Sequence, residues 1–154
     1  MLSERPVREA DRIYTIMTRN LGLVQATALG VRKEASKLRG ALEPFVLSKI
    51  SLVRGKEHWR VTSAECIHSL SPTPTVARPL VLLEKFVRGE ASHPELFDAV
   101  EDALLYAKPH DEMFEIRLVS QILFHLGYLK EDDLTLGKKS LVKAINEGIQ
   151  ASHL

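Results

Sequence analysis

Apolar and β-branched residues in the first 70 positions of the chain occur in short runs separated by turn residues. Short runs of this kind, bounded by Gly, Asn, Pro or charged residues, are typical of β-strands. In one run the residue types alternate, which places Trp59, Val61 and Ser63 on the same face of a strand. The pattern predicts strands at residues 11–18, 23–31, 46–53 and 59–66.

Turn residues connect these predicted strands. Asn20 and Gly22 favour a tight turn after the first, because both residue types tolerate left-handed backbone. Residues 54–57 (Arg-Gly-Lys-Glu) have the composition of a hairpin turn, and residues 34–42 are expected to form a short helix or ordered loop that ends at Pro44. Several short strands with one small helical insertion favour a Greek-key barrel of the oligonucleotide-binding (OB) type.

Residues 71–75 (Ser-Pro-Thr-Pro-Thr) form the clearest break in the chain, because Pro lacks an N–H group and restricts the residue before it. We therefore predict a domain boundary there, with an OB-fold domain over residues 1–72 and a helical domain over residues 73–154. Beyond the break, apolar residues recur every three or four positions, the period of an α-helix. The apolar positions of four predicted helices are Leu80, Leu83 and Val87; Leu96, Val100 and Leu104; Ile116, Val119, Leu123 and Leu126; and Leu141, Ile145 and Ile149.

The start of the second predicted helix has the strongest local signal. Ser92 and Glu95 have the spacing of a capping box, and Pro94 fits the first turn, where its missing N–H group costs little. Gly89 and Gly127 predict the ends of the first and third helices. The fold class is thus predicted to be α+β, an N-terminal OB-fold-like barrel followed by an all-α domain.

Charge differs between the two parts, although the formal net charge of the chain is only +1. Residues 1–70 contain 12 Lys and Arg against 7 Asp and Glu, whereas residues 71–154 contain 9 against 13. A basic part suggests a polyanionic partner. The chain has no run of about 20 apolar residues, the length that spans a bilayer, and its first residues are too polar for a signal peptide. We therefore expect a cytoplasmic protein.

The residue types needed for catalysis or metal binding do not form a recognisable pattern. Cys66 is the single cysteine, so neither an internal disulfide nor a Cys-rich zinc site is available. Its place in a predicted strand favours a small buried side chain over a nucleophile. The six histidines lack metal-ligand spacing, and the acidic residues 131–133 are typical of a solvated loop or a helix start. We expect no enzyme activity, no cofactor and no metal.

Several segments, taken in order, resemble a known family. Residues 9–23 contain an acidic E-x-D motif, a strand ending in Thr and a Gly-containing turn. Small-Gly-basic, K-S-x-L-R-like and L-x-P-F elements follow, and three later segments are similar more loosely. Together they resemble the RecO family of bacterial DNA repair proteins. The segments after residue 23 are 28–33, 36–40 and 42–45, with 94–97, 123–129 and 144–154 as the looser ones.

The resemblance implies a protein that binds single- and double-stranded DNA and promotes strand annealing. It further implies that the protein works with RecR and single-stranded DNA-binding protein to load the recombinase RecA. Many family members have a four-ligand zinc site that a chain with one cysteine lacks. Residues 1–5 match only the end of the family's first barrel strand, so we expect a shortened strand or an internal start. The alternative function is a protein-interaction adaptor of the recombination machinery with little DNA affinity.

The main candidate site is a set of basic residues. Cations on a loop beside an OB barrel can follow a phosphate backbone without reading bases. Surface Lys and Arg are also common for solubility alone, so a solvated loop is the competing interpretation. The candidate nucleic-acid-binding residues are Arg32, Lys33, Lys37 and Arg39, extended on the predicted hairpin by Arg54, Lys56 and Arg60.

Aromatic stacking is the other means by which an OB fold binds a single strand. Tyr14, Phe45 and Trp59 are the aromatic residues of the N-terminal part. Each is expected to lie in the core rather than to form a stacking platform. Phosphate contacts are therefore expected to dominate.

Overall fold

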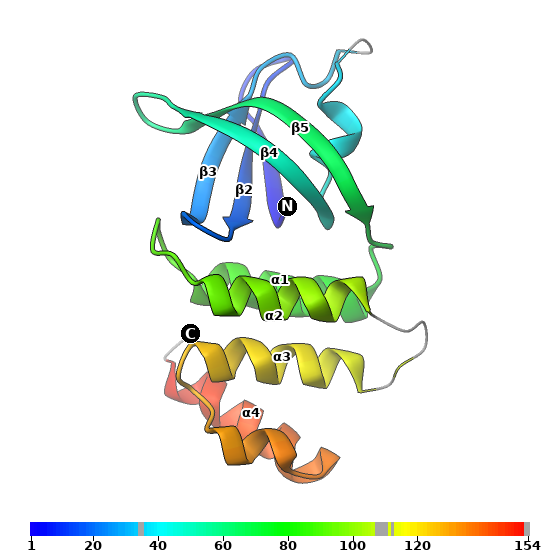
Figure 1. Cartoon of the computed structure of the whole chain (residues 1–154), viewed down its shortest axis with the longest axis vertical. Coiled ribbons are helices and arrows are strands. Elements are labelled where there is room, and N and C mark those ends of the chain that lie inside the picture. The colour runs from blue at the N-terminus through cyan, green and yellow to red at the C-terminus, as the bar shows by residue number, and fades with distance from the viewer. Residues whose placement is uncertain (34–35, 107–110, 112, 153–154) are drawn as a thin grey trace.

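A curved five-stranded sheet forms the N-terminal part of the molecule, and four α-helices follow it in the described residues (Figure 1). The computed structural model describes residues 1–33, 36–106, 111 and 113–152. This arrangement confirms the predicted α+β class. The strands are β1 (Ser3–Pro6), β2 (Arg12–Thr18), β3 (Gly22–Ala28), β4 (Val46–Arg54) and β5 (Trp59–Ser69). The helices are α1 (Pro74–Phe86), α2 (Pro94–Leu105), α3 (Phe114–His125) and α4 (Lys138–Ala151), with short 3-10 helices η1 (Arg39–Ala41) and η2 (Glu131–Thr135).

The strands lie side by side in the order β1-β2-β3-β5-β4, and all neighbours are antiparallel except β3 and β5. The two edge strands approach each other at Met1. Its amino group donates to the Val46 carbonyl at 3.0 Å, and its own carbonyl accepts from the Phe45 N–H at 3.0 Å. A curved sheet of this kind agrees with the expected OB-like architecture. Because β1 and β4 do not pair as strands in the described sheet, a closed barrel stays a prediction.

The inner face of the sheet is apolar because side chains alternate along β2 and β3. Tyr14, Ile16, Val24 and Ala26 point into one cluster, which Leu42 also enters from the loop before β4. β3 ends at Ala28, earlier than predicted, because the chain turns at Gly30, whose φ is +63°. Of the short helix expected over residues 34–42, only η1 forms in the described part, and residues 34–35 lie outside the described residues.

Strand β5 departs from the predicted alternation at a β-bulge. Ser51 pairs with Ser63 and Leu52 with Val61, so Thr62 is the extra residue. Beyond the bulge Ala64 packs against the inner cluster and Ser63 is exposed, so the predicted placement of Ser63 on the same face as Val61 is wrong.

Cys66 is exposed, and the expectation of a buried cysteine is also wrong. The reason lies in the pairing of β5. It pairs with β3 only at Trp59 and Arg60, and farther along it pairs with β4 alone. In that part of β5, residues 65–67 are all exposed.

Helices α1 and α2 lie across one end of the sheet, and α3 and α4 form further layers (Figure 1). One core cluster joins the two parts of the chain: Leu2 and Met17 from the sheet pack with Leu83 of α1, Leu96 of α2 and Leu118 of α3. The change from strand to helix falls in the residues between β5 and α1, as the proline-rich segment predicted. The division of the chain into two domains at residue 72 stays a prediction.

Helix α3 buries two faces, whereas the sequence pattern revealed one. The predicted stripe, represented by Val119 and Leu123, packs with Leu141 and Ile145 of α4. A second stripe, Phe114, Leu118 and Ile122, joins the core shared with α1, α2 and the sheet. A helix placed between two layers is apolar over more of its circumference than a surface helix.

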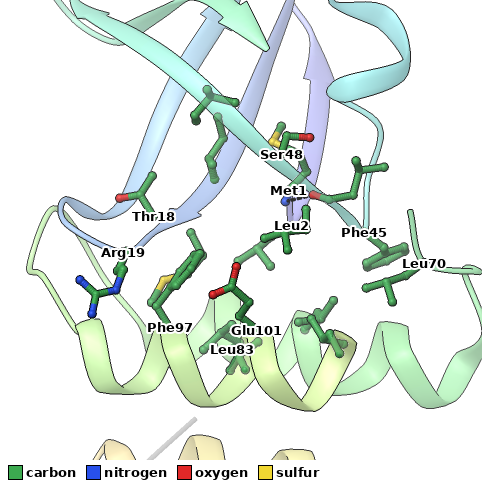
Figure 2. Close-up of a pocket in the computed structure, with 18 residues that line it drawn as sticks. Met1, Leu2, Thr18, Arg19, Phe45, Ser48, Leu70, Leu83, Phe97 and Glu101 are labelled. Atoms are coloured by element: carbon green, nitrogen blue, oxygen red, sulfur yellow. Dashed lines mark hydrogen bonds between the residues drawn. The ribbon is translucent and has the colours of Figure 1, made fainter. Parts of the chain in front are cut away.

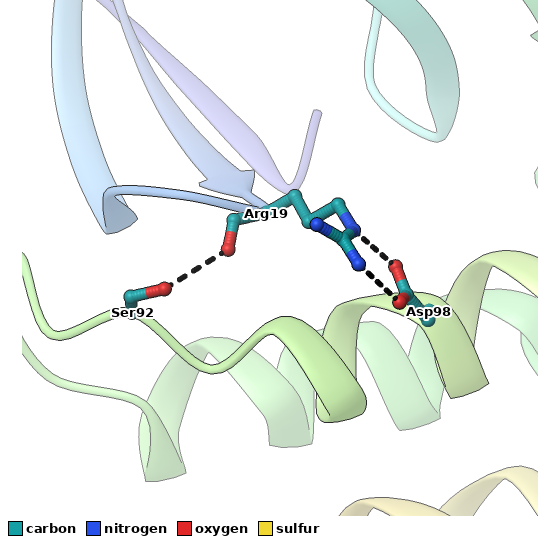
Figure 3. Close-up of polar contacts among 3 residues, drawn as sticks. All are labelled: Arg19, Ser92 and Asp98. Carbon is teal, nitrogen blue, oxygen red and sulfur yellow. Dashed lines mark hydrogen bonds and ion pairs between the residues drawn. The ribbon is translucent and has the colours of Figure 1, made fainter.

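The predicted capping box at the start of α2 is wrong, although the helix begins at Pro94 as expected. The N-cap residue is His93, and no side-chain cap hydrogen bond forms there. The Ser92 hydroxyl donates instead to the Arg19 carbonyl at 3.1 Å (Figure 3). A tertiary contact with the β2–β3 turn thus replaces the local one.

Candidate nucleic-acid interface

The loop between β3 and β4 is anchored where the chain enters it. The Asp11 carboxylate accepts a hydrogen bond from the Gly30 N–H at 2.8 Å. The Arg32 N–H donates to the Ala10 carbonyl at 3.3 Å, and the Arg32 guanidinium donates to the Glu9 carbonyl at 3.1 Å. The acidic motif and the small-Gly-basic element therefore meet in space, and the loop entrance is held against residues 7–11.

The four predicted cations of this loop are all exposed: Arg32, Lys33, Lys37 and Arg39. We call these four residues the basic loop. Among the ion pairs between described residues, none engages a member of the basic loop. Four cationic side chains are therefore available to an anionic ligand on one anchored segment.

Arg32 and Arg39 share a hollow of about 330 Å³ with Arg12, a residue that the sequence pattern did not identify. Glu4 and Glu43 also line this hollow, and Glu4 forms an ion pair with Arg12. Buried Tyr14 forms part of the wall, and its burial raises the pKa of its phenol, which stays neutral. Arg12 follows the acidic motif directly, but only the folded register of β2 shows that it lies beside the basic loop.

The cations of the β4–β5 hairpin lie elsewhere on the surface. Arg54, Lys56 and Arg60 are exposed, and the Gly55 N–H closes the hairpin turn by donating to the His58 carbonyl at 3.1 Å. Figure 1 shows the tip of this hairpin on one side of the sheet and the loop before β4 on the other. The structure therefore brings the predicted site residues together as two sets rather than as one patch.

The three aromatic residues of the N-terminal part lie in or against the core, as predicted. Tyr14 is buried, and Phe45 packs partly buried against the cluster shared with the helices. Trp59 packs partly buried against the inner cluster of the sheet. Its ring lies under the Arg54 guanidinium, 5.0 Å from the ring centroid, and its Nε1–H donates to Glu90 at 3.1 Å. The exposed surface of the sheet therefore offers cations rather than open aromatic faces.

An ion pair and a cavity mark the contact between sheet and helices. Arg19 donates two hydrogen bonds to Asp98 of α2, at 2.7 and 2.8 Å (Figure 3). The hydrogen bond from Arg19 lowers the pKa of the Asp98 carboxyl. Beside this pair lies a largely apolar cavity of about 250 Å³, whose walls include Phe97 and Glu101 (Figure 2). None of the seven predicted site residues lines this cavity, so it is separate from both basic surfaces.

The described ranges contain neither a cluster of metal-ligating side chains nor a helix that could span a membrane. No three His, Cys, Asp or Glu side chains in those ranges are grouped in a way that would hold a metal ion. The helices described there are all too short or too polar to cross a membrane. The acidic residues 131–133 fall within η2.

Comparison with known proteins identifies the family. A family model described as "Recombination protein O N terminal" matches residues 1–70. The DNA repair protein RecO of Synechococcus sp. (strain JA-3-3Ab) is 36% identical over 137 residues, which cover 87% of this chain and 42% of that protein. RecO of Gloeothece citriformis is 33% identical over 116 residues, covering 75% of this chain and 38% of that protein.

A shorter match is more similar: RecO of Dehalococcoides mccartyi (strain ATCC BAA-2266 / KCTC 15142 / 195) is 51% identical over 61 residues, covering 40% of this chain and 24% of that protein. The chain spans less than half the length of these curated relatives. The match to the family model includes the segments that anchor and form the basic loop. The chain belongs to the RecO family.

Proposed function

We propose that this chain acts in DNA repair and recombination by binding single- and double-stranded DNA through the basic loop. The observation that carries the proposal is the set of four exposed cations on one anchored segment, with no ion pair to any described residue. That segment lies within residues 1–70, which match the RecO family model. Arg12 lines the hollow that Arg32 and Arg39 share, and the hairpin cations form a second, separate positive surface.

The proposed mechanism is electrostatic and non-catalytic. Lys and Arg side chains that neutralise phosphates release condensed counterions, and this release drives binding whatever the base sequence. Two complementary strands held with part of their charge neutralised repel each other less, which favours annealing. We propose that RecR and single-stranded DNA-binding protein act as partners in loading RecA, as the family relationship implies.

The second candidate function is a protein-interaction adaptor. The observation that favours it is a hollow of about 320 Å³ between α1, α3 and α4, where Leu82, Val119 and Ile149 form part of an apolar lining. A partner protein rather than DNA would match a surface of this composition. The two functions differ in whether the isolated chain binds DNA.

Charge reversal tests the proposal. Lys37→Glu with Arg39→Glu should weaken binding to unrelated labelled oligonucleotides to the same extent, measured by fluorescence anisotropy, and should slow annealing. The matched control, Lys139→Glu with Lys143→Glu, changes the net charge equally on exposed positions of α4 and should have little effect. For about four to six neutralised phosphates on a single strand, log K should fall against log salt with a slope of roughly −3 to −4. Equal losses from both pairs would contradict the assignment to the basic loop, and no DNA binding at low salt would favour the adaptor.

A further inference from the structure

The loop between α1 and α2, residues 87–93, is held against the sheet. The Gly89 carbonyl accepts a hydrogen bond from the Leu23 N–H at 3.1 Å. Three residues later, the Ser92 hydroxyl donates to the Arg19 carbonyl at 3.1 Å. Glu90 lies between these two anchors, so the helical part of the molecule fixes its position relative to the sheet.

One carboxylate oxygen of Glu90 receives two donors from the β4–β5 hairpin. The Arg54 guanidinium donates to this oxygen at 2.6 Å, and the Trp59 Nε1–H donates to it at 3.1 Å. The same guanidinium lies over the Trp59 ring, 5.0 Å from its centroid. The hydrogen bond from Arg54 lowers the pKa of Glu90, so the residue stays a carboxylate at neutral pH. These contacts hold the two donor groups of the hairpin around a single anionic oxygen.

A non-bridging oxygen of a phosphodiester is also anionic and accepts hydrogen bonds from a guanidinium and a neutral N–H, so it can replace the Glu90 oxygen between these two donors. We propose that Arg54 and Trp59 form a second phosphate-binding position for the DNA backbone, and that Glu90 occupies it in the free protein and is displaced when DNA binds. This inference rests on the proposed function, because the DNA must first be held by the basic loop.

The exposure of the contact makes the exchange feasible. Arg54 and Glu90 have side-chain exposures of 56% and 44%, and ion pairs so exposed contribute little to stability. Lys56 and Arg60 are exposed on the same hairpin and add positive charge near the position. Glu90 therefore weakens DNA binding by competing with phosphate, without locking the position closed.

Glu90→Gln tests the competition, because it removes the charge and keeps the shape of the side chain. The matched control is Glu57→Gln, which makes the same change of net charge at an exposed position on the hairpin itself. Glu90→Gln should tighten single-stranded DNA binding by about two- to fivefold at low salt, the range expected from an exposed ion pair. The slope of log K against log salt should stay close to that of the wild type, because the same phosphate contact forms once Glu90 is displaced, whereas Arg54→Ala should make the slope shallower by roughly 0.7. In an Arg54→Ala background, Glu90→Gln should add no more than Glu57→Gln does.

Trp59 provides an independent readout, because it is the only tryptophan of the chain. Its fluorescence should change when an oligonucleotide displaces Glu90 from Nε1, and less so in Arg54→Ala. Inorganic phosphate at the same phosphate concentration should give little change, since it lacks the contacts to the basic loop. An equal change with inorganic phosphate would overturn the assignment to the DNA backbone.

Two results distinguish a failure of the proposed phosphate position at the hairpin from a failure of the proposed DNA binding. If the oligonucleotide binds the wild type with unchanged Trp59 emission, and Glu90→Gln binds no tighter than Glu57→Gln, the phosphate position at the hairpin is wrong while DNA binding stands. If no variant binds DNA at low salt, the proposed function is wrong and the inference fails with it.

Discussion

Gly22→Ala should disrupt the contact between the sheet and the helical part. Gly22 begins β3 with a φ of +73°, in the left-handed region that favours glycine. A Cβ atom at this position would lie 2.1 Å from the Ala91 carbonyl oxygen and 2.7 Å from its carbon. These are backbone atoms of the α1–α2 loop, which the hydrogen bond between Leu23 and Gly89 holds in place. The collision therefore cannot be relieved by rotating a side chain.

The expected loss of stability has two parts. Left-handed backbone costs a non-glycine residue about 1–2 kcal/mol, and forcing extra atoms into a packed contact typically costs about 1–3 kcal/mol. Gly22→Ala should therefore lower the free energy of unfolding by about 2–5 kcal/mol. Gly89→Ala separates the two parts, because Gly89 has a φ of +72° with no atom within 4 Å of an added Cβ. Gly89→Ala should therefore lower the free energy of unfolding only by the cost of the left-handed backbone, about 1–2 kcal/mol.

Urea unfolding measures both variants, with Trp59 fluorescence reporting on the sheet and far-UV circular dichroism reporting on the helices. Because one core cluster joins the two parts, the two transitions should coincide in the wild type. A loss of stability for Gly22→Ala no larger than that for Gly89→Ala would refute the predicted collision with Ala91. Transitions that separate in the wild type would refute the coupling between sheet and helices.

Two further predictions concern the core and the ion pair at the same contact. Leu118→Ala removes a side chain with no exposed surface from the cluster between α1, α2 and the sheet, and should cost about 3–5 kcal/mol of unfolding free energy, whereas Val142→Ala on the exposed side of α4 should cost far less. Both are measured by the same urea titration, and similar losses would contradict the placement of α3. Because Asp98 has a lowered pKa in the folded state, its ion pair with Arg19 stabilises the protein above the ordinary carboxyl pKa and is lost as the pH falls through the lowered value. The stability difference between wild type and Asp98→Asn should therefore shrink on acidification, and a difference that persists at the lowest pH would contradict this origin.

The sequence by itself determined the type and approximate position of most elements, although β1 was not among the four strands that its residue pattern predicted. β2 and β4 begin and end within about a residue of their predicted bounds, and all four predicted helices are present in the described residues. Side-chain periodicity is a local property: a strand places alternate residues on one face, and a helix places every third or fourth residue on one face, whatever the rest of the chain does. The basic loop could also be predicted locally, because a group of Lys and Arg residues between two predicted strands is visible in the sequence without knowledge of tertiary contacts.

The tertiary structure decided which residues meet. The bulge in β5 that turns Ser63 outward depends on pairing with β4, and the exposure of Cys66 depends on where β3 stops pairing with β5. The Ser92 hydroxyl donates to a carbonyl 73 positions earlier in the chain instead of capping α2. The Glu90 carboxylate accepts a hydrogen bond from the Arg54 guanidinium, 36 positions away. Contacts over such separations depend on how the layers pack, and no local pattern of residue types encodes that geometry.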